Sequence, residues 1–480
     1  MRRGRTPALA AVALVIALLV PEAAAAAPSP PDEWDPRIQR FVDFVERDRD
    51  RDLEFEHPVR VEFLGDAAFR RRLERDEANL TDEDRHDIEE SAAIFRALGL
   101  LTAEVDFLGA SSDLDADTIL GYYDFDTKKM VVRGTELGDV ETRATVVHEL
   151  THALQDQRDG IDKLYDRTET SGEIFALDAL TEGDPIYVET DFVDTLPAKQ
   201  QDEYYSVDPD ATATTAEPDP TSPDVPEIMA IASDAPYTLG FDFLIELSAK
   251  GPPALARAYR RPPVSEEQII DPVAWAEHDR PRAVAKPPLE PGDEKAAPAD
   301  EFGALSLYLT LASRIDPLVA LDAATGWGGD RFRGFTRDGL DCLRGTFVGD
   351  TARDTSELAA ALGEWAATLP AGMATVTSGD EGVQLTSCAV PGVTDPDPEQ
   401  LDRAFYFTLD HRLTNANQAL FAGLSPDEAS CVGTASVSEP DLAAIEARLY
   451  GEQITYDDLP ARERDRYDEL IGEAVQDCAG

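Results

Sequence analysis

The stretch "VVHELTHALQDQ", residues Val146 to Gln157, places His148 and His152 four positions apart, with Glu149 directly after the first histidine. Residues four apart on a helix lie on one face about one turn apart. At that separation two imidazole nitrogens can bind one zinc ion at about 2 Å. The opposite face is apolar and carries Val146, Val147, Leu150, Ala153 and Leu154. The stretch therefore predicts a packed helix that presents a metal site.

Glu149 is placed to act on water rather than to bind the metal. As the neighbour of His148 it cannot easily reach the same ion, but it can reach a water molecule bound there. Zinc lowers the pKa of such a water to about 7, and an adjacent carboxylate can take the proton. The H-E-x-x-H pattern is typical of metallopeptidases. The alternative is that the two histidines line an ordinary helix without a metal.

A catalytic zinc ion needs a third protein ligand and an open coordination position. No histidine occurs between His152 and His278, so a carboxylate is the natural candidate. Glu182 lies in the otherwise apolar and small stretch "ALDALTEGDP", where a metal would justify burial of a charge. We therefore expect Glu182 to be the third ligand. The candidate carboxylates for the third ligand, all downstream of His152, are Glu169, Glu173, Asp178, Glu182, Asp184 and Glu189.

Two aspartates near Glu182 are candidates for orienting a ligand histidine by a hydrogen bond. Asp178 lies one turn before Glu182, and Asp184 lies two residues after it. Glu173 is assigned a different task, since Thr170 and Glu173 have the spacing of a capping box.

The predicted helix of the opening stretch has clear ends. Asp139 is a suitable N-cap and Gly160 a suitable C-terminal stop. A second helix is predicted from Thr170, and Pro185 is expected to kink it or to end its first part. Before these helices, residues 58–64 alternate like a strand and residues 119–134 read as a β-hairpin. The pattern predicts an α+β fold.

The charge of the chain excludes one class of partner. The 480 residues include 96 acidic and 43 basic side chains, a formal net charge of -53. A protein that binds nucleic acid by neutralising phosphates needs the opposite sign, so we expect no nucleic-acid partner. Because the acidic residues are spread along the chain, the composition is typical of a halophilic protein, in which salt screens self-repulsion.

The N-terminus has the pattern of a signal peptide. Residues 1–27 contain the basic "MRRGR", an apolar run of about 14 residues, and small residues suited to cleavage. No later stretch is long and apolar enough to predict a transmembrane segment of the mature protein. We therefore expect a secreted, extracellular protein, whose oligomeric state the sequence does not indicate.

All four cysteines lie in the last third of the chain. An even number in an exported protein predicts two disulfides. Cys342–Cys388 with Cys431–Cys478 is the preferred one of three pairings.

Changes in composition suggest the domain organisation. Residues 28–57 form an N-terminal segment, and residues 58–340 the domain that carries the site, with an acidic, proline-rich insert at 207–226. Residues 341–390 form a small α+β extension, and residues 391–480 a helical C-terminal module.

"HELTH" followed by "ALTEGD" resembles the gluzincin branch of the zincin metallopeptidases, and more specifically a group of exported bacterial zincin-like proteins. "GYYD", "MVVRG", "APYTLGFDF", "RPPVSEEQI" and "GWGGDR" support the grouping, which covers roughly residues 58–335. The resemblance implies a zincin fold, with a mixed sheet packed on the site helix and a mostly helical second half. It also implies Zn²⁺ bound by His148, His152 and Glu182, and peptide hydrolysis with Glu149 as general base.

Zincins commonly bind a peptide along an edge strand, and the 119–134 hairpin is the candidate for this role; the alternative is a purely structural hairpin. Tyr237 is the candidate electrophile, with a packed aromatic residue as its alternative. The rival hypothesis is a binding or cell-envelope protein that keeps the fold and zinc without catalysis. A fourth ligand from His278 or Asp184 would favour that rival.

Overall fold

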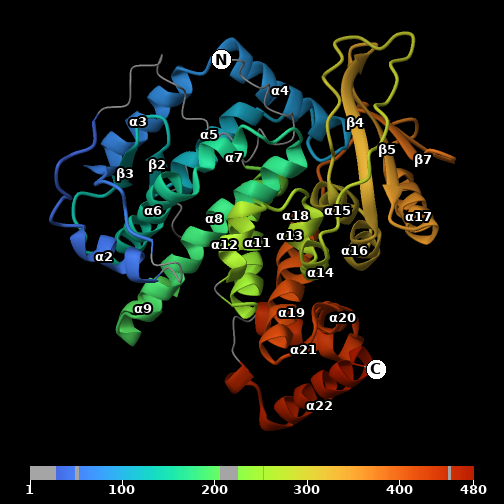
Figure 1. The fold of residues 1–480 in the computed structure, drawn as a ribbon. Helices are drawn as coiled ribbons and strands as arrows, with labels where there is room; N and C mark the ends of the chain where they lie inside the picture. Colours follow the sequence, from blue (N-terminus) through green and yellow to red (C-terminus); the bar gives the residue numbers. More distant parts are fainter. Residues whose placement is uncertain (1–28, 49–52, 206–224, 252, 452–455, 480) are drawn as a thin grey trace.

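The computed structural model describes most of the chain, in residues 29–48, 53–205, 225–251, 253–451 and 456–479. The predicted signal peptide, residues 1–27, lies outside the described residues, as does most of the predicted insert at 207–226. The fold is α+β with a helical majority and two small sheets (Figure 1).

The first sheet has the strand order β1-β3-β2 and is mixed. β1 (Arg60–Leu64) runs parallel to β3 (Lys129–Arg133), and β2 (Gly121–Asp124) runs antiparallel to β3. Both the strand at 58–64 and the hairpin at 119–134 are therefore confirmed. β2 is an edge strand, and its outer edge pairs with no other strand of the described chain.

Helix α6 (Val140–Asp159) carries the opening stretch and packs on this sheet. Asp139 accepts a hydrogen bond from the backbone N–H of Thr142, and Gly160 ends the helix with a left-handed φ of 68°. Both predicted ends are confirmed. The apolar face of α6 shares one core with the sheet, with α2 (Gln39–Asp48) and with α8, formed by residues that include Ile38, Phe41, Val45, Met130, Val132, Val147, Leu150 and Val188.

Helix α8 (Ser171–Asp194) begins at the predicted N-cap, where the Thr170 side chain accepts from the N–H of Glu173. The expected capping box is not reciprocal, because the Glu173 carboxylate accepts from the N–H of Glu169 at 2.6 Å instead. Pro185 does not end the helix, which continues to Asp194. Proline removes one N–H but leaves the helical φ intact, so neighbouring packing can hold the helix together.

Helix α11 (Glu227–Ala249) crosses α8 at a contact between two glycines (Figure 1). A Cβ atom on Gly183 would collide with the backbone of Gly240, and a Cβ on Gly240 would collide with the carbonyl of Ala179. The two backbones therefore touch directly. With 23 residues, α11 is long and apolar enough to cross a membrane, but 56% of its apolar window is buried inside the fold, as in a core helix.

Further helices occur in the first two thirds of the chain. They are α3 (Asp66–Ala78), α4 (Asp82–Ala97), α5 (Phe107–Thr118), α7 (Ile161–Tyr165), α9 (Ala198–Tyr205), α12 (Pro253–Arg260), α13 (Glu267–Ile270), α14 (Pro272–Glu277), α15 (Ala304–Ala312) and α16 (Pro317–Thr325). A large apolar core joins α4, α8, α11 and α15 to the second sheet.

The second sheet is antiparallel, with the order β4-β5-β7-β6. Its strands are β4 (Trp327–Arg337), β5 (Leu340–Gly349), β6 (Ala374–Gly379) and β7 (Gly382–Cys388), and α17 (Ala352–Thr368) packs on it. The sequence-based boundary between residues 340 and 341 falls inside the β4–β5 hairpin, after the first residue of β5, and so divides two strands that pair along their lengths.

The two preferred disulfides are confirmed. Cys342 and Cys388 face each other across β5 and β7, and Cys431 and Cys478 join α20 (Pro426–Ser438) to α22 (Ala461–Cys478). The C-terminal part is helical, as expected, and also contains α18 (Pro398–Asp402), the π-helix η1 (Arg403–Asp410), α19 (His411–Phe421), α21 (Pro440–Gly451) and the short 3-10 helix η2 (Tyr456–Asp458).

Candidate metal centre

Helices α6 and α8 bring three ligand-type side chains to one point. The Nε2 atoms of His148 and His152 lie 3.2 Å apart. The Oε2 atom of Glu182 lies 3.5 Å from Nε2 of His148 and 3.1 Å from Nε2 of His152. The structure thus gathers the three residues that the sequence selected, from two helices separated by a loop.

The triangle has the size that a zinc ion requires. Ligands about 2.0–2.1 Å from zinc at tetrahedral angles are about 3.3–3.4 Å from one another. The three measured separations, 3.1, 3.2 and 3.5 Å, bracket that value. Two nitrogens and one carboxylate oxygen are also a ligand set that suits zinc. The residues present therefore fit the metal.

Two buried oxygens at this point have no hydrogen-bond partner in the described chain. One is Oε2 of Glu182, which faces the two imidazoles, although the rest of that side chain is 23% exposed. The other is Oε2 of Glu149, which is 5% exposed as a residue. Burial of a carboxylate oxygen without a hydrogen-bond partner costs free energy. We therefore expect a cation or a water molecule beside each of these two atoms.

The same burial shifts the acidity of these groups. Burial raises the pKa of Glu149 from its usual value. Burial alone would also raise the pKa of Glu182, but the charges of the His152 and His148 imidazoles and their close polar contacts with its carboxylate hold it at about 2. Glu182 is therefore anionic, whereas Glu149 is the more basic carboxylate of the two.

The outward nitrogen of His148 is held by a residue that sequence reasoning did not select for this task. Nδ1 of His148 lies 3.1 Å from Oε2 of Glu189, and the hydroxyl of Tyr204 donates to Oε1 of Glu189 at 2.6 Å. Glu189 follows Glu182 by seven residues, two helical turns, and so lies on the same face of α8. That spacing was the signal available in the sequence.

The outward nitrogen of His152 is held by Gln155. Nδ1 of His152 lies 3.0 Å from Oε1 of Gln155. The Gln155 amide in turn donates to the backbone carbonyl of Thr181 at 3.0 Å, to Asp184 at 3.1 Å and to the hydroxyl of Tyr259 at 2.7 Å. This buried network sets the orientation of His152.

The two aspartates proposed as partners of the histidines do not contact them. Asp184 accepts a hydrogen bond from Gln155, and it is Gln155 that contacts His152. Asp178 accepts a hydrogen bond at 2.6 Å from the hydroxyl of Tyr165. The sequence prediction was wrong here because a carboxylate close to Glu182 in sequence does not lie over the outward nitrogen of either imidazole.

Tyr237 lies at the site, on α11. Its ring stacks beside the His148 imidazole, with the ring centroids 6.3 Å apart and the planes 27° from parallel. Burial, then the charges of Glu182 and Glu149, raise the pKa of Tyr237 well above its usual value. The hydroxyl therefore remains a neutral hydrogen-bond donor. The glycine contact between α8 and α11 brings this ring close to the metal ligands.

No fourth side chain closes the group within the described part of the chain. His278 ends α14, where its ring contacts Trp275 and its Nδ1 lies 3.1 Å from the Trp275 carbonyl. Asp184 is engaged with Gln155 and Tyr259. One position opposite the ligand triangle is thus left to a small molecule, as a catalytic zinc site needs.

Edge strand β2 borders the site. A Cβ atom on Gly121 would lie 2.7 Å from the Thr145 side chain and 3.5 Å from Cγ of Glu149. Only glycine allows the strand to approach α6 this closely. β2 therefore packs closely against α6 beside Glu149.

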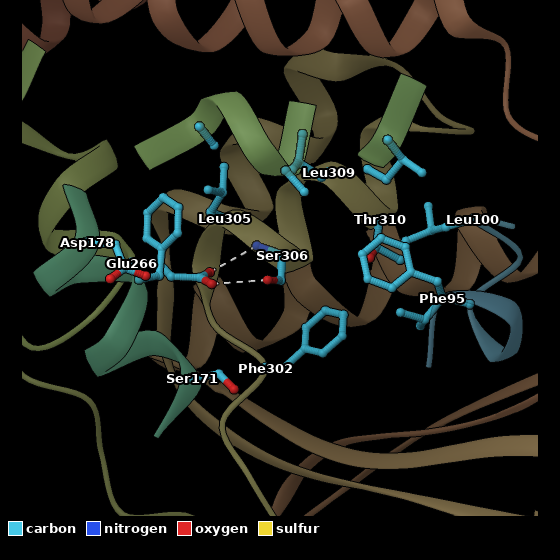
Figure 2. A pocket seen from close by; sticks show the side chains of 15 residues that line it. Phe95, Leu100, Ser171, Asp178, Glu266, Phe302, Leu305, Ser306, Leu309 and Thr310 are labelled. Carbon is cyan, nitrogen blue, oxygen red and sulfur yellow. Dashed lines mark hydrogen bonds between the residues drawn. The ribbon is translucent and has the colours of Figure 1, made fainter. Parts of the chain in front are cut away.

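An apolar cavity of about 70 Å³ is lined in part by residues of α8 (Figure 2). Asp178, one turn before Glu182, lines it, so the cavity borders the same helix face. Figure 2 shows Asp178 and Glu266 at one end, where burial raises the pKa values of these two groups to about 8 and about 7. The apolar lining includes Phe95, Leu98, Phe175, Ala235, Phe302 and Leu305.

Comparisons of the chain with protein-family models, with curated proteins and with solved structures found no match. The function is therefore argued from the geometry of the site.

Proposed function

We propose that the chain is an exported zinc metallopeptidase with a zincin-like fold of the gluzincin type. The observation that carries the proposal is the triangle formed by His148, His152 and Glu182, whose sides of 3.1–3.5 Å match a tetrahedral zinc site. The mixed sheet packed on α6 and the helical second half are consistent with such a fold. The acidic composition suits activity at high salt.

His148, His152 and Glu182 would hold the zinc ion. When bound, zinc lowers the pKa of a water molecule and polarises a peptide carbonyl. Glu149 takes a proton from the water as its oxygen forms a bond to the carbonyl carbon, and then gives the proton to the departing amine as the C–N bond breaks. The raised pKa of Glu149 and its partner-free Oε2 atom suit both transfers.

The substrate would lie along the outer edge of β2. Its backbone would pair with the strand, which places a peptide bond beside Glu149. The Tyr237 hydroxyl would donate to the oxygen on which charge develops. The apolar cavity next along α8 would accept an apolar side chain of the substrate.

The rival function is a binding or cell-envelope protein that retains zinc without turnover. Two observations favour the enzyme over this rival. Glu149 has a buried oxygen without a partner, and no fourth ligand joins the three within the described chain. A closed structural zinc site would require four protein ligands and no general base.

The test is cleavage of a peptide library at molar salt with zinc, by the secreted protein and by its Glu149→Gln variant. The matched control is Glu141→Gln, in the first turn of the same helix. Wild type and control should cleave, and Glu149→Gln should bind zinc equally well and lose about 10²–10⁴-fold in rate. A folded, zinc-loaded wild type that cleaves no peptide would favour the binding-protein reading.

A further inference from the structure

Three carboxylates from separate segments of the chain lie close together in space. In sequence they are distant from the proposed zinc ligands. They belong to Glu267 at the start of α13, to Asp279 just after α14, and to Asp350 just after β5. One oxygen from each lies within 4.8 Å of the others. Acidic groups repel one another, so their convergence on one point requires a reason.

Glu267 supplies that reason. The residue is only 3% exposed, and no hydrogen bond or ion pair to its carboxylate occurs within the described chain. Its neighbour Glu266 shows the usual solution, since that carboxylate is 4% exposed and accepts hydrogen bonds from both the N–H and the hydroxyl of Ser306 (Figure 2). A buried carboxylate without a partner that points at two others marks the place of a cation.

The local charge suits a divalent ion. Arg282 is the nearby basic residue, and its guanidinium donates to the backbone carbonyls of Gly349 and Asp350 rather than to the three carboxylates. Burial and the charge of Asp279 raise the pKa of Asp350 to about 6, although Arg282 opposes the rise, and burial and the other two acids raise the pKa of Glu267 to about 9. A bound cation would keep all three carboxylates ionised, and three carboxylates with one guanidinium then carry two net negative charges.

We propose that Glu267, Asp279 and Asp350 form a calcium site. Calcium binds carboxylate oxygens at about 2.3–2.6 Å, so two ligands on opposite sides of the ion can be about 4.8 Å apart. The three carboxylate oxygens lie within 4.8 Å of one another, so all three can reach one calcium ion. Magnesium keeps several bound waters and usually binds through only one or two carboxylates, so three converging carboxylates suit calcium better.

The position of the site indicates its role. Glu267 belongs to the helical part, Asp350 ends a strand of the second sheet, and Asp279 lies on the connection between them. Gly328 packs tightly against Asp350, since a Cβ there would lie 2.8 Å from both the backbone N and Oδ1 of that residue. Bound calcium would tie the four-stranded sheet to the helices that surround the metal centre.

The test titrates the zinc-loaded secreted protein with CaCl₂ at constant high NaCl, by calorimetry and by thermal unfolding. We expect one saturable calcium ion per chain, a Tm that rises with calcium, and a weaker effect of MgCl₂. Glu267→Gln should weaken calcium binding by about tenfold or more, because affinity follows ligand charge. The control Glu381→Gln, in the exposed turn between β6 and β7, should bind as wild type.

Zinc content should be unchanged in every variant, which separates this site from the centre on α6 and α8. If Glu267→Gln does not fold, Asp279→Asn gives the same test at an exposed position. The proposal is overturned if wild type shows no saturable calcium binding above the control, or if both variants bind calcium as wild type does. Binding of magnesium as tight as calcium would overturn the choice of ion.

Discussion

The side-chain amide of Gln155 donates to the backbone carbonyl of Thr181 at 3.0 Å, and this is the carbonyl that Pro185 leaves without a helical partner. In a continuous helix the N–H four residues later would occupy it. Proline has no N–H, so the freed acceptor anchors Gln155, which in turn contacts His152. A proline inside a helix thereby helps to orient His152, a proposed metal ligand.

Pro185→Ala should weaken zinc binding although it improves helix propensity. The new N–H would compete with Gln155 for the Thr181 carbonyl, and loss of such support for a ligand typically costs about 10–100-fold in metal affinity. Zinc affinity is measured by competition with a chelating dye. Gln155→Leu should give a similar loss, and the double variant should lose less than the sum, since both act through one carbonyl. Full additivity would contradict this coupling.

Glu189→Gln should also weaken zinc binding by about 10–100-fold, because Glu189 orients His148 and raises its basicity. Tyr204→Phe should have a smaller effect of the same kind, since its hydroxyl holds the other oxygen of Glu189. Glu173→Gln is the control on the same helix, where the carboxylate only caps the N-terminus. Equal zinc affinity in Glu189→Gln and in this control would rule out the orienting role.

Tyr237→Phe should lower kcat by about 10²-fold with little change in KM or in zinc content. The ring would keep its place beside His148, and only the donor to the developing charge would be lost. Steady-state kinetics on a peptide found by the library screen gives the two constants. An unchanged kcat would assign Tyr237 to packing alone.

Gly183→Ala should destabilise the protein by about 1–3 kcal/mol, because the new methyl group collides with the backbone of Gly240 and forces α8 and α11 apart. Gly363→Ala in α17 is the matched control. No atom lies within 4 Å of its Cβ position, so alanine there should stabilise the helix by about 0.5–1 kcal/mol. Denaturant unfolding measures both changes, and equal signs would contradict the close contact.

Glu266→Gln should reduce the pH dependence of stability. Burial raises the pKa of Glu266 from its ordinary 4.5 to about 7 in the folded chain. The cost of burying its charge is therefore absent below about pH 4.5, grows as pH rises, and is complete above about pH 7. That difference corresponds to about 3 kcal/mol.

Glutamine keeps the shape of Glu266 and can hydrogen-bond both Ser306 groups without a charge. The free energy of unfolding, measured from pH 4 to pH 8, should fall less steeply in Glu266→Gln than in wild type. Glu381→Gln, which changes an exposed carboxylate, should follow the wild-type curve. Parallel curves for all three proteins would show that Glu266 is charged throughout.

Local patterns accounted for the helices and strands around the site and for the three candidate metal ligands. Asp139 and Gly160 bound α6 because a cap is a property of adjacent residues, and His148 faces His152 because four residues make one helical turn. Glu182 stood out as a charge in an apolar stretch. The two disulfides followed from an even cysteine count and a preference for near pairing.

The surroundings of those ligands were decided by the tertiary structure. Glu189 rather than Asp178 supports a histidine because the crossing of α6 and α8 sets which turn of α8 lies over Nδ1 of His148. The calcium candidates around Glu267 come from segments up to 83 positions apart. The periodicity of a sequence does not indicate how two helices cross or which loops lie close together. Those relations depend on side-chain packing between distant segments, and only the folded chain determines them.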